Sequence, residues 1–170
     1  MTFDKRSVIG GSGLLSFTTF LVKKSRTSSP SKVTTVDYPL TLEYRNIPNG
    51  GLQPAVEVEL TNGARSARTV AILDSGATHT VFSYEIAQLL GIEDVRTGTR
   101  VDASTLGGRI EFYLFEVEIR LPGENQRFAG QIGFFPGQIP RNILGRILFF
   151  SRFEVGFRER HQRLHLRPED

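Results

Sequence analysis

The stretch Val70-Ala71-Ile72-Leu73-Asp74-Ser75-Gly76-Ala77, followed by Thr78-His79-Thr80-Val81-Phe82, is the most informative part of this chain. Its apolar first half predicts a buried strand, and the residues after Leu73 predict a tight loop at the end of that strand. Asp-Ser-Gly is a common turn signal, because Asp and Ser bond their own backbone and Gly accepts a positive φ. The alternative is a carboxylate presented for chemistry. The tripeptide Asp74-Ser75-Gly76 occurs once in 170 residues.

Strand and turn signals surround this stretch at short spacing. Val56-Glu57-Val58-Glu59-Leu60 alternates apolar and polar residues, Thr61-Asn62-Gly63 supplies a turn, and residues 68–73 return as a nearly continuous apolar strand. Together they predict a hairpin that delivers Asp74 at its end.

A short helix is expected next. Ser83 suits an N-cap and Gly91 is placed to end the helix, with one apolar face formed by Ile86, Leu89 and Leu90.

The rest of the chain predicts further short strands. Residues 101–105 and 109–121 are expected to pair, with Leu106-Gly107-Gly108 at the tip of their hairpin. The remaining predicted elements are a strand at 126–134, a turn at 136–137, an apolar strand at 142–145, a second helix at 146–151 and a strand at 153–157. The prediction is a small all-β domain with one or two short helices, and no repeat of 20 to 50 residues is visible.

The first 36 residues differ in character from the predicted domain at 37–170. An uncharged stretch at 7–22 carries three glycines and is followed by basic and then polar residues. As a helix it would span about 24 Å, short of the roughly 30 Å hydrocarbon core of a bilayer. A disordered tail is favoured, with a membrane anchor, an uncleaved signal or a misassigned start as alternatives. A cytoplasmic location is accordingly favoured, with membrane association through residues 7–22 as the alternative.

Charge and cysteine content restrict the chemistry. The pI near 9.5 suggests nucleic acid, but residues 1–36 hold six Lys/Arg and one Asp, which leaves 15 basic and 17 acidic residues in the other 134. That part has a net charge of −2, so nucleic acid is not expected as a partner. The basic run Arg158–Arg167 is interpreted as a solvated strand edge. The absence of cysteine excludes disulfides, thiolate metal sites and cysteine nucleophiles.

Three features in this order resemble one family. They are Ala71-Ile72-Leu73-Asp74-Ser75-Gly76-Ala77, a glycine-bearing hairpin at Thr105 to Arg109, and Asn142-Ile143-Leu144-Gly145-Arg146. The chain resembles the retroviral-type, or retropepsin-like, aspartic proteases over roughly residues 50–158, as a single-domain, non-viral or bacterial-type member. The resemblance implies a small, closed, barrel-like all-β fold that acts as a two-fold dimer and hydrolyses peptide bonds.

The resemblance also implies a role for each motif. Asp74 would be the catalytic carboxylate, supported by Ser75, Gly76 and Ala77 in its loop. Many family members have Thr where this chain has Ser75, a change that keeps the hydroxyl. A substrate-binding flap would comprise Thr105, Leu106, Gly107 and Gly108, and Ile143-Leu144-Gly145 would pack behind the catalytic loop.

A single copy of the motif implies a homodimer, because this chemistry needs two facing carboxylates that share one proton. No metal or cofactor is expected, and the substrate would be a polypeptide, held between apolar walls that include Ile72, Val81 and Ile143. The alternative is an inactive dimerisation or peptide-binding module of the same fold.

Other acidic and histidine residues have simpler interpretations. Asp94 and Asp102 lack the Ser/Thr-Gly context and are interpreted as loop and strand-edge acids. His79 is interpreted as structural or exposed, and His161 and His165 lack the spacing of a metal site.

Overall fold

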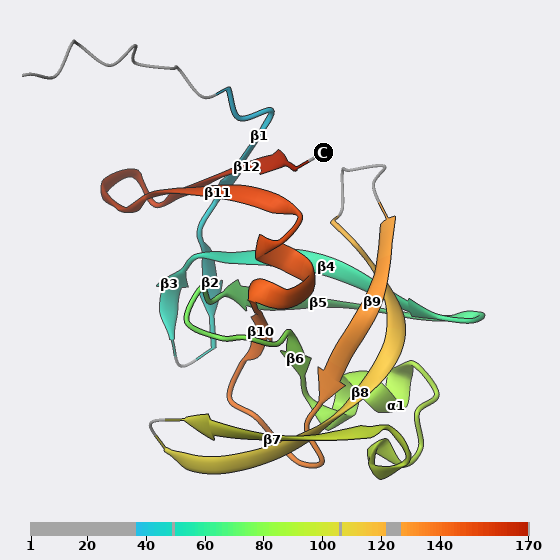
Figure 1. The fold of residues 1–170 in the computed structure, drawn as a ribbon. Helices are drawn as coiled ribbons and strands as arrows, with labels where there is room; N and C mark the ends of the chain where they lie inside the picture. The colour runs from blue at the N-terminus through green and yellow to red at the C-terminus, as the bar shows by residue number, and fades with distance from the viewer. Residues whose placement is uncertain (1–36, 49, 106, 122–126, 170) are drawn as a thin grey trace, which may run out of the picture. The chain divides into compact units, whose positions relative to one another are not determined.

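The computed structural model describes residues 37–48, 50–105, 107–121 and 127–169 of the chain (Figure 1). The predicted appendage at 1–36 and the hairpin-tip residue Leu106 lie outside the described residues. The strands in chain order are β1 (Leu40–Glu43), β2 (Arg45–Ile47), β3 (Gly51–Gln53), β4 (Ala55–Asn62), β5 (Arg65–Leu73), β6 (Val81–Phe82), β7 (Thr99–Thr105), β8 (Gly108–Arg120), β9 (Arg127–Phe134), β10 (Asn142–Leu144), β11 (Phe153–Arg158) and β12 (Arg163–Pro168). One α-helix, α1 (Tyr84–Leu89), and two single 3₁₀ turns, Val95–Thr97 and Glu159–His161, complete the regular elements of the described part.

A seven-stranded sheet curls into a closed ring. Its order is β4-β5-β10-β6-β9-β8-β7, and β4 also pairs with β8, so six strands close on themselves and β7 extends from β8. The long strand β8 makes this possible, because it pairs with β7, β9 and β4 along successive parts of its length. The fold is all-β and of the retropepsin type, as the sequence predicted.

The hairpin that leads to Asp74 forms as predicted. β4 and β5 pair antiparallel from Ala55↔Ile72 to Asn62↔Arg65, and Gly63 adopts a φ of +58° in the turn between them. Helix α1 follows Ser83, and Gly91 with φ +79° ends it in the left-handed region. Leu89 does not belong to the buried face, because its side chain is 59% exposed; Ile86, Ala87 and Leu90 are buried instead.

The predicted helix at 146–151 is not regular. Arg146–Phe150 forms one wide turn in which Ile147 is extended and Leu148 has a φ of +82°. The cause is a tertiary contact: the backbone N–H groups of Arg146 and Ile147 donate to Ala77 and Thr78 carbonyls, and this pins the segment to the loop after Asp74.

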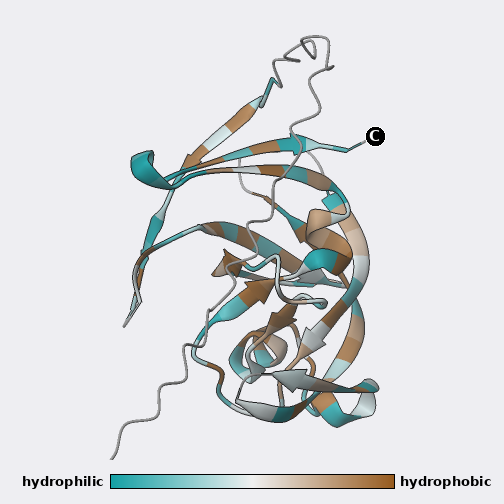
Figure 2. Cartoon of the chain, turned by 60° about the vertical axis from the view of Figure 1, so that its left-hand side comes forward, coloured by the Kyte–Doolittle hydropathy of each residue, from teal (hydrophilic) through white to brown (hydrophobic). Residues whose placement is uncertain are grey.

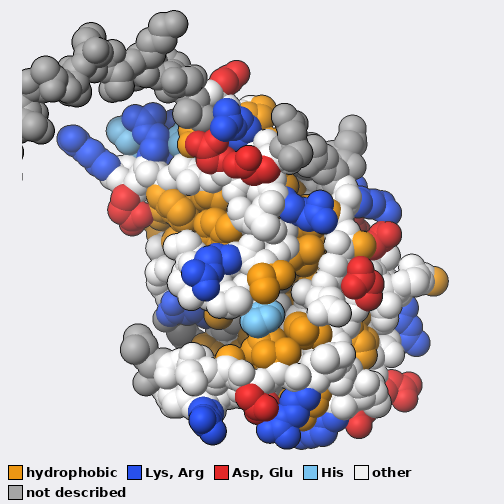
Figure 3. Space-filling view, viewed as in Figure 1, with side chains coloured by type: hydrophobic (Ala, Val, Ile, Leu, Met, Phe, Trp, Pro, Cys, Tyr) orange, Lys and Arg blue, Asp and Glu red, His pale blue; other side chains and the backbone are white. Residues whose placement is uncertain are grey.

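A separate three-stranded sheet has the order β1-β12-β11. β12 therefore lies in the centre of this sheet, and the prediction that Arg158–Arg167 is a strand edge is wrong. Two of its arginines pair with acids on the flanking strands, Arg163 with Glu43 and Arg167 with Glu154. On the face seen in Figure 3 basic and acidic side chains are interspersed.

The core fills the ring with aromatic and aliphatic side chains. Figure 2 shows hydrophobic residues along the strands that enclose it. The largest fully buried side chains include Phe82, Phe112, Phe134 and Phe149. Phe134 contacts the rings of Phe82 and Phe115, so β6, β8 and β9 meet at this residue. Within the described ranges no helix has the length and hydrophobicity needed to cross a membrane.

Candidate active site

Asp74 follows the C-terminal end of β5, in a loop that is fixed by its own hydrogen bonds. Its Oδ1 accepts from the Gly76 N–H at 2.9 Å, and its carbonyl accepts from the Ala77 N–H at 3.1 Å. The Asp74 N–H in turn donates to Leu144 on β10 at 3.0 Å. The carboxylate is thereby held in one position relative to the sheet.

The loop is open on its outer side. Asp74 and Ala77 are half-buried, while Ser75 and Gly76 are exposed. Among the described residues the Ser75 hydroxyl has no hydrogen-bond partner. A Cβ on Gly76 would come within 3.1 Å of Asp74 Oδ1, so a larger residue would crowd the carboxylate.

β10 supports the loop from behind, where the sequence placed Ile143, Leu144 and Gly145. Ile143 pairs with Ile72 on one side and with Val81 on the other, so the three predicted wall residues are neighbours in the sheet. Leu144 is fully buried. Gly145 touches the chain just after the Asp74 loop, because a Cβ there would lie 2.3 Å from the His79 carbonyl oxygen.

Thr80 joins the loop to this support and was missed in the sequence. Among the described residues Thr80 is the one polar residue that is buried, with 1% of its surface exposed. Its hydroxyl accepts from the Gly145 N–H at 3.0 Å and donates to the Ile147 carbonyl at 3.2 Å. A threonine among strand-forming residues is common, so nothing in the sequence indicated that the Thr80 hydroxyl bonds to Gly145 and Ile147.

A Thr80→Val variant is expected to lose about 1–3 kcal/mol of unfolding free energy, because the shape is kept while the Gly145 N–H stays buried without an acceptor. Chemical denaturation measures this loss. Thr80→Ser is the matched control, since it retains the hydroxyl and loses one methyl group. Equal stability of Thr80→Val and wild type would show that the hydroxyl does not support the loop.

Asn142 is a second residue that the sequence did not single out as polar support. Its amide donates to the Thr69 hydroxyl at 2.9 Å, and its Oδ1 accepts from the Ser83 N–H at 3.0 Å. It therefore ties β5 to the start of α1. Its place immediately before the apolar pair Ile143-Leu144 was the available signal.

The predicted flap is the hairpin of β7 and β8. Thr105 pairs with Gly108, and the Thr105 hydroxyl donates to the Gly108 carbonyl at 2.9 Å and accepts from the Gly107 N–H at 3.2 Å. Gly108 has a φ of +113°, a backbone conformation that is strained for residues with a side chain. These three residues are exposed. The tip of the hairpin is therefore exposed, and hydrogen bonds within the hairpin itself hold it.

One arginine bridges two carboxylates on the β7–β8 hairpin. Asp102 and Glu111 are directly opposite in the β7–β8 register, and Arg100 lies within 2.8 Å of the first carboxylate and 3.1 Å of the second. The hydrogen bond that Arg100 donates to Asp102 raises the pKa of Arg100 further above its ordinary value. Burial, followed by the hydrogen bond to Glu111, raises the pKa of Tyr113. Asp102 therefore pairs with Arg100 on the edge strand β7, in agreement with a strand-edge acid.

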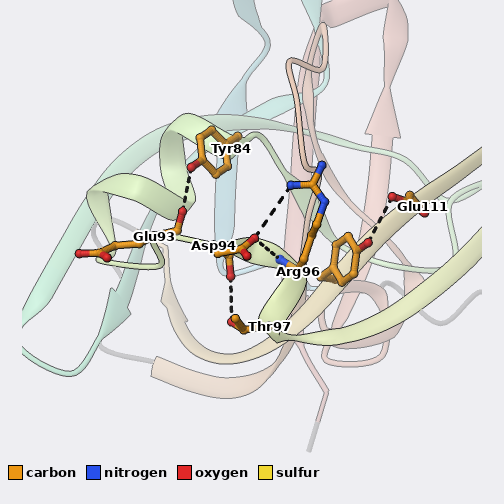
Figure 4. Close-up of polar contacts among 7 residues, drawn as sticks. Tyr84, Glu93, Asp94, Arg96, Thr97 and Glu111 are labelled. Carbon is orange, nitrogen blue, oxygen red and sulfur yellow. Dashed lines mark hydrogen bonds and ion pairs between the residues drawn. The ribbon is translucent and has the colours of Figure 1, made fainter.

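The other acid that the sequence set aside, Asp94, repeats the local geometry of Asp74 without its surroundings. Figure 4 shows its carboxylate beside Arg96, whose N–H donates to Asp94 Oδ1 at 2.9 Å. Asp94 is exposed and starts a 3₁₀ turn.

His79 is half-buried and packs edge-on against Phe112, with 5.3 Å between the ring centroids, which is a structural contact. Within the described ranges no group of three His, Asp or Glu residues could hold a metal ion.

The barrel, the loop that presents Asp74 and the glycine-bearing hairpin define the class: an all-β fold of the acid-protease type. The sequence model of a family described as aspartyl protease matches residues 55–146, and the chain belongs to this retropepsin-like family. That match spans β4 to the residue after Gly145, and so contains both Asp74 and its support. The comparison with curated proteins gives no match.

Proposed function

We propose that this protein is an aspartic endopeptidase whose active site forms between two copies of the chain. The observation that carries the proposal is Asp74, held in a rigid loop inside the family match yet open on its outer side. The domain proposed for this activity is 37–170, within the compact unit Val36–Asp170.

One chain supplies one such loop, and the reaction requires two carboxylates. Facing carboxylates about 3 Å apart cannot both ionise, so the pair retains one proton. A two-fold axis beside Asp74 brings the second carboxylate from an identical loop. The exposed Ser75 hydroxyl and Gly76 support this arrangement, since a small residue and a free hydroxyl suit a close approach of two loops.

The chemistry proceeds through a water molecule between the two Asp74 carboxylates. The ionised carboxylate takes a proton from the water while the oxygen of the water bonds to the scissile carbonyl carbon. The protonated carboxylate donates its proton to the carbonyl oxygen. The carbon–nitrogen bond then breaks, and a proton passes to the departing amine. No metal or covalent intermediate takes part.

The substrate binds as an extended strand. The flap at Thr105, Leu106, Gly107 and Gly108 closes over it with backbone donors and excludes water. Ile72, Val81 and Ile143 line the cleft and favour hydrophobic residues around the cleaved bond. The inactive module remains the alternative function, and it would bind peptide in this way without turnover.

Mixing two kinds of chain tests the shared site. An equal mixture of wild type and Asp74→Asn, after free exchange of subunits, contains about a quarter of dimers with both carboxylates intact. Peptidase activity is expected to fall to about a quarter of that of the same total amount of wild type, measured with a fluorogenic peptide at mildly acidic pH. If each chain were active on its own, the mixture would retain about half of the wild-type activity.

The control is an equal mixture of wild type with Asp94→Asn, because Asp94→Asn makes the same chemical change on an exposed carboxylate outside the Asp74 loop. This mixture should retain full activity. Activity of about one half with Asp74→Asn, under conditions where sedimentation shows monomer and dimer in reversible equilibrium, would contradict the shared site.

A further inference from the structure

The wide turn Arg146–Phe150, between β10 and β11, exposes an apolar side chain beside the Asp74 loop (Figure 1). Ile147 in this turn is 47% exposed. The large apolar side chains that are exposed in the described chain are Leu52, Leu89, Ile147 and Phe157. Of these four residues, Ile147 is the one whose backbone bonds to the chain that follows Asp74. Nothing in the function proposed above assigns a role to its side chain.

Both backbone groups of Ile147 are bonded to the segment that leaves the Asp74 loop. Its N–H donates to the Thr78 carbonyl at 2.8 Å, and its carbonyl accepts from the Thr80 hydroxyl at 3.2 Å. Ala77, the residue before Thr78, closes the loop by donating its N–H to the Asp74 carbonyl at 3.1 Å. The position of Ile147 is therefore fixed relative to Asp74.

The backbone is strained at the next residue. Leu148 has a φ of +82° and a ψ of −42°, values close to those of a γ-turn with positive φ, which is rare and strained. Extended Ile147 and the positive φ of Leu148 send consecutive side chains in opposite directions, so that Ile147 is exposed and Leu148 is buried. A regular helix would avoid this strain.

The core holds the buried half of this arrangement. Gly130 on β9 has no side chain, and a Cβ there would lie 2.5 Å from Leu148 Cδ1. Phe149 is fully buried and stacks on Phe153, with 5.1 Å between the ring centroids. A strained residue persists where its surroundings determine its conformation, and such residues cluster at functional sites. The packing of Leu148 and Phe149 sustains the strain, and the exposed Ile147 is what the strain produces.

A second copy of the chain is the partner that fits Ile147. The site proposed above brings two Asp74 carboxylates to about 3 Å from each other, so the surface around each loop is covered when two chains meet. Ser75 and Gly76 are exposed on the outer side of the loop, and Ile147 is the exposed apolar residue bonded to the segment after it. The buried centre of a homodimer interface is more apolar than the rest of the surface, because burial of apolar area drives association.

We propose that Ile147 is an apolar anchor of the interface between two copies of the chain, beside the paired Asp74 loops. This inference rests on the proposed function and deepens it, because one chain holds half of the site and Ile147 marks the surface through which the other half arrives. The contact is isologous, so each chain presents its own Ile147 to the same surface of its partner.

Dilution of the full chain tests the proposal. Ile147→Asp places a charge in the apolar contact and is expected to raise the dimer dissociation constant by about tenfold or more. Sedimentation measures this constant, and cleavage of a fluorogenic peptide measures the activity per chain at each concentration. The activity that the variant loses on dilution should return at high concentration, because the substitution changes association and leaves Asp74 in place. A merely structural role of Ile147 would lower the activity at every concentration.

Leu89→Asp is the matched control, because Leu89 is an exposed apolar residue on α1 without a bond to the Asp74 loop. It should dissociate like wild type. The chain has no cysteine, so the thiol of Ile147→Cys can be labelled selectively. Its reaction with a maleimide should slow by about tenfold or more at concentrations where dimers form. The thiol of Leu89→Cys should react at one rate throughout.

The outcomes separate this proposal from the proposed function. If wild type dimerises and cleaves peptides while Ile147→Asp dissociates like wild type, the interface lies elsewhere and the peptidase stands. A thiol in Ile147→Cys that reacts at one rate at all concentrations would overturn the interface by itself, whatever the effect of Ile147→Asp. A wild-type chain that dimerises through Ile147 and cleaves no peptide would support the interface and overturn the peptidase.

Discussion

Replacing Asp74 with Asn is expected to abolish peptidase activity, by about 10³-fold or more, in a protein that folds like wild type. The amide keeps the oxygen that accepts from the Gly76 N–H, so the turn survives the change. It cannot take a proton from water, and in the proposed dimer both carboxylates are lost at once. Steady-state cleavage of a fluorogenic peptide measures the activity, and circular dichroism with thermal unfolding checks the fold.

Asp94→Asn separates catalysis from turn formation. Asp94 accepts from the N–H two residues ahead with the same 2.9 Å geometry as Asp74, and it lies in the loop after α1 (Figure 4). If Asp74 served only its turn, the two variants would behave alike. Full activity is expected for Asp94→Asn. Persistent cleavage by Asp74→Asn would leave the chain as a peptide-binding module or place the chemistry elsewhere.

The parts of the fold that the sequence predicted are those governed by local pattern. Alternation in residues 56–60 and the turn at Gly63 were enough to find the hairpin that ends at Asp74, because such a hairpin is specified by neighbours along the chain. Gly91 marked the end of α1 for a similar local reason. The candidate site was located from the Asp74-Ser75-Gly76 motif and from the family resemblance that its surroundings carry, and its loop directly follows this hairpin.

Features that depend on distant partners were missed or mistaken. The segment Arg146–Phe150 has a helical composition, but hydrogen bonds to Ala77 and Thr78 override its propensity. β12 looked like an edge because it is rich in arginine, yet strands from both ends of the described chain flank it. The β2–β3 hairpin and the role of Thr80 are likewise set by contacts across the fold, which no single stretch of sequence records.

Gly145→Ala is expected to be the most damaging small substitution in the support of the Asp74 loop. The added Cβ would lie 2.3 Å from the His79 carbonyl oxygen and 2.5 Å from its carbonyl carbon. These are backbone atoms, so no rotamer change relieves the clash. The chain after His79 would have to move, although Thr80 bonds both Gly145 and Ile147. We expect a loss of about 3 kcal/mol or more, at the upper end of overpacking costs.

Chemical denaturation of Gly145→Ala beside Gly137→Ala isolates this clash from the general effect of replacing a glycine. A Cβ at Gly137 meets its nearest neighbour, the Phe135 ring, at an ordinary 3.7 Å, so that variant should unfold within about 0.5 kcal/mol of wild type. Because domains are stable by only about 5–15 kcal/mol, Gly145→Ala should also lower the yield of folded protein. Unfolding midpoints that agree for the two variants would mean that β10 does not press on the loop, and the rigidity attributed to Asp74 would lose its physical basis.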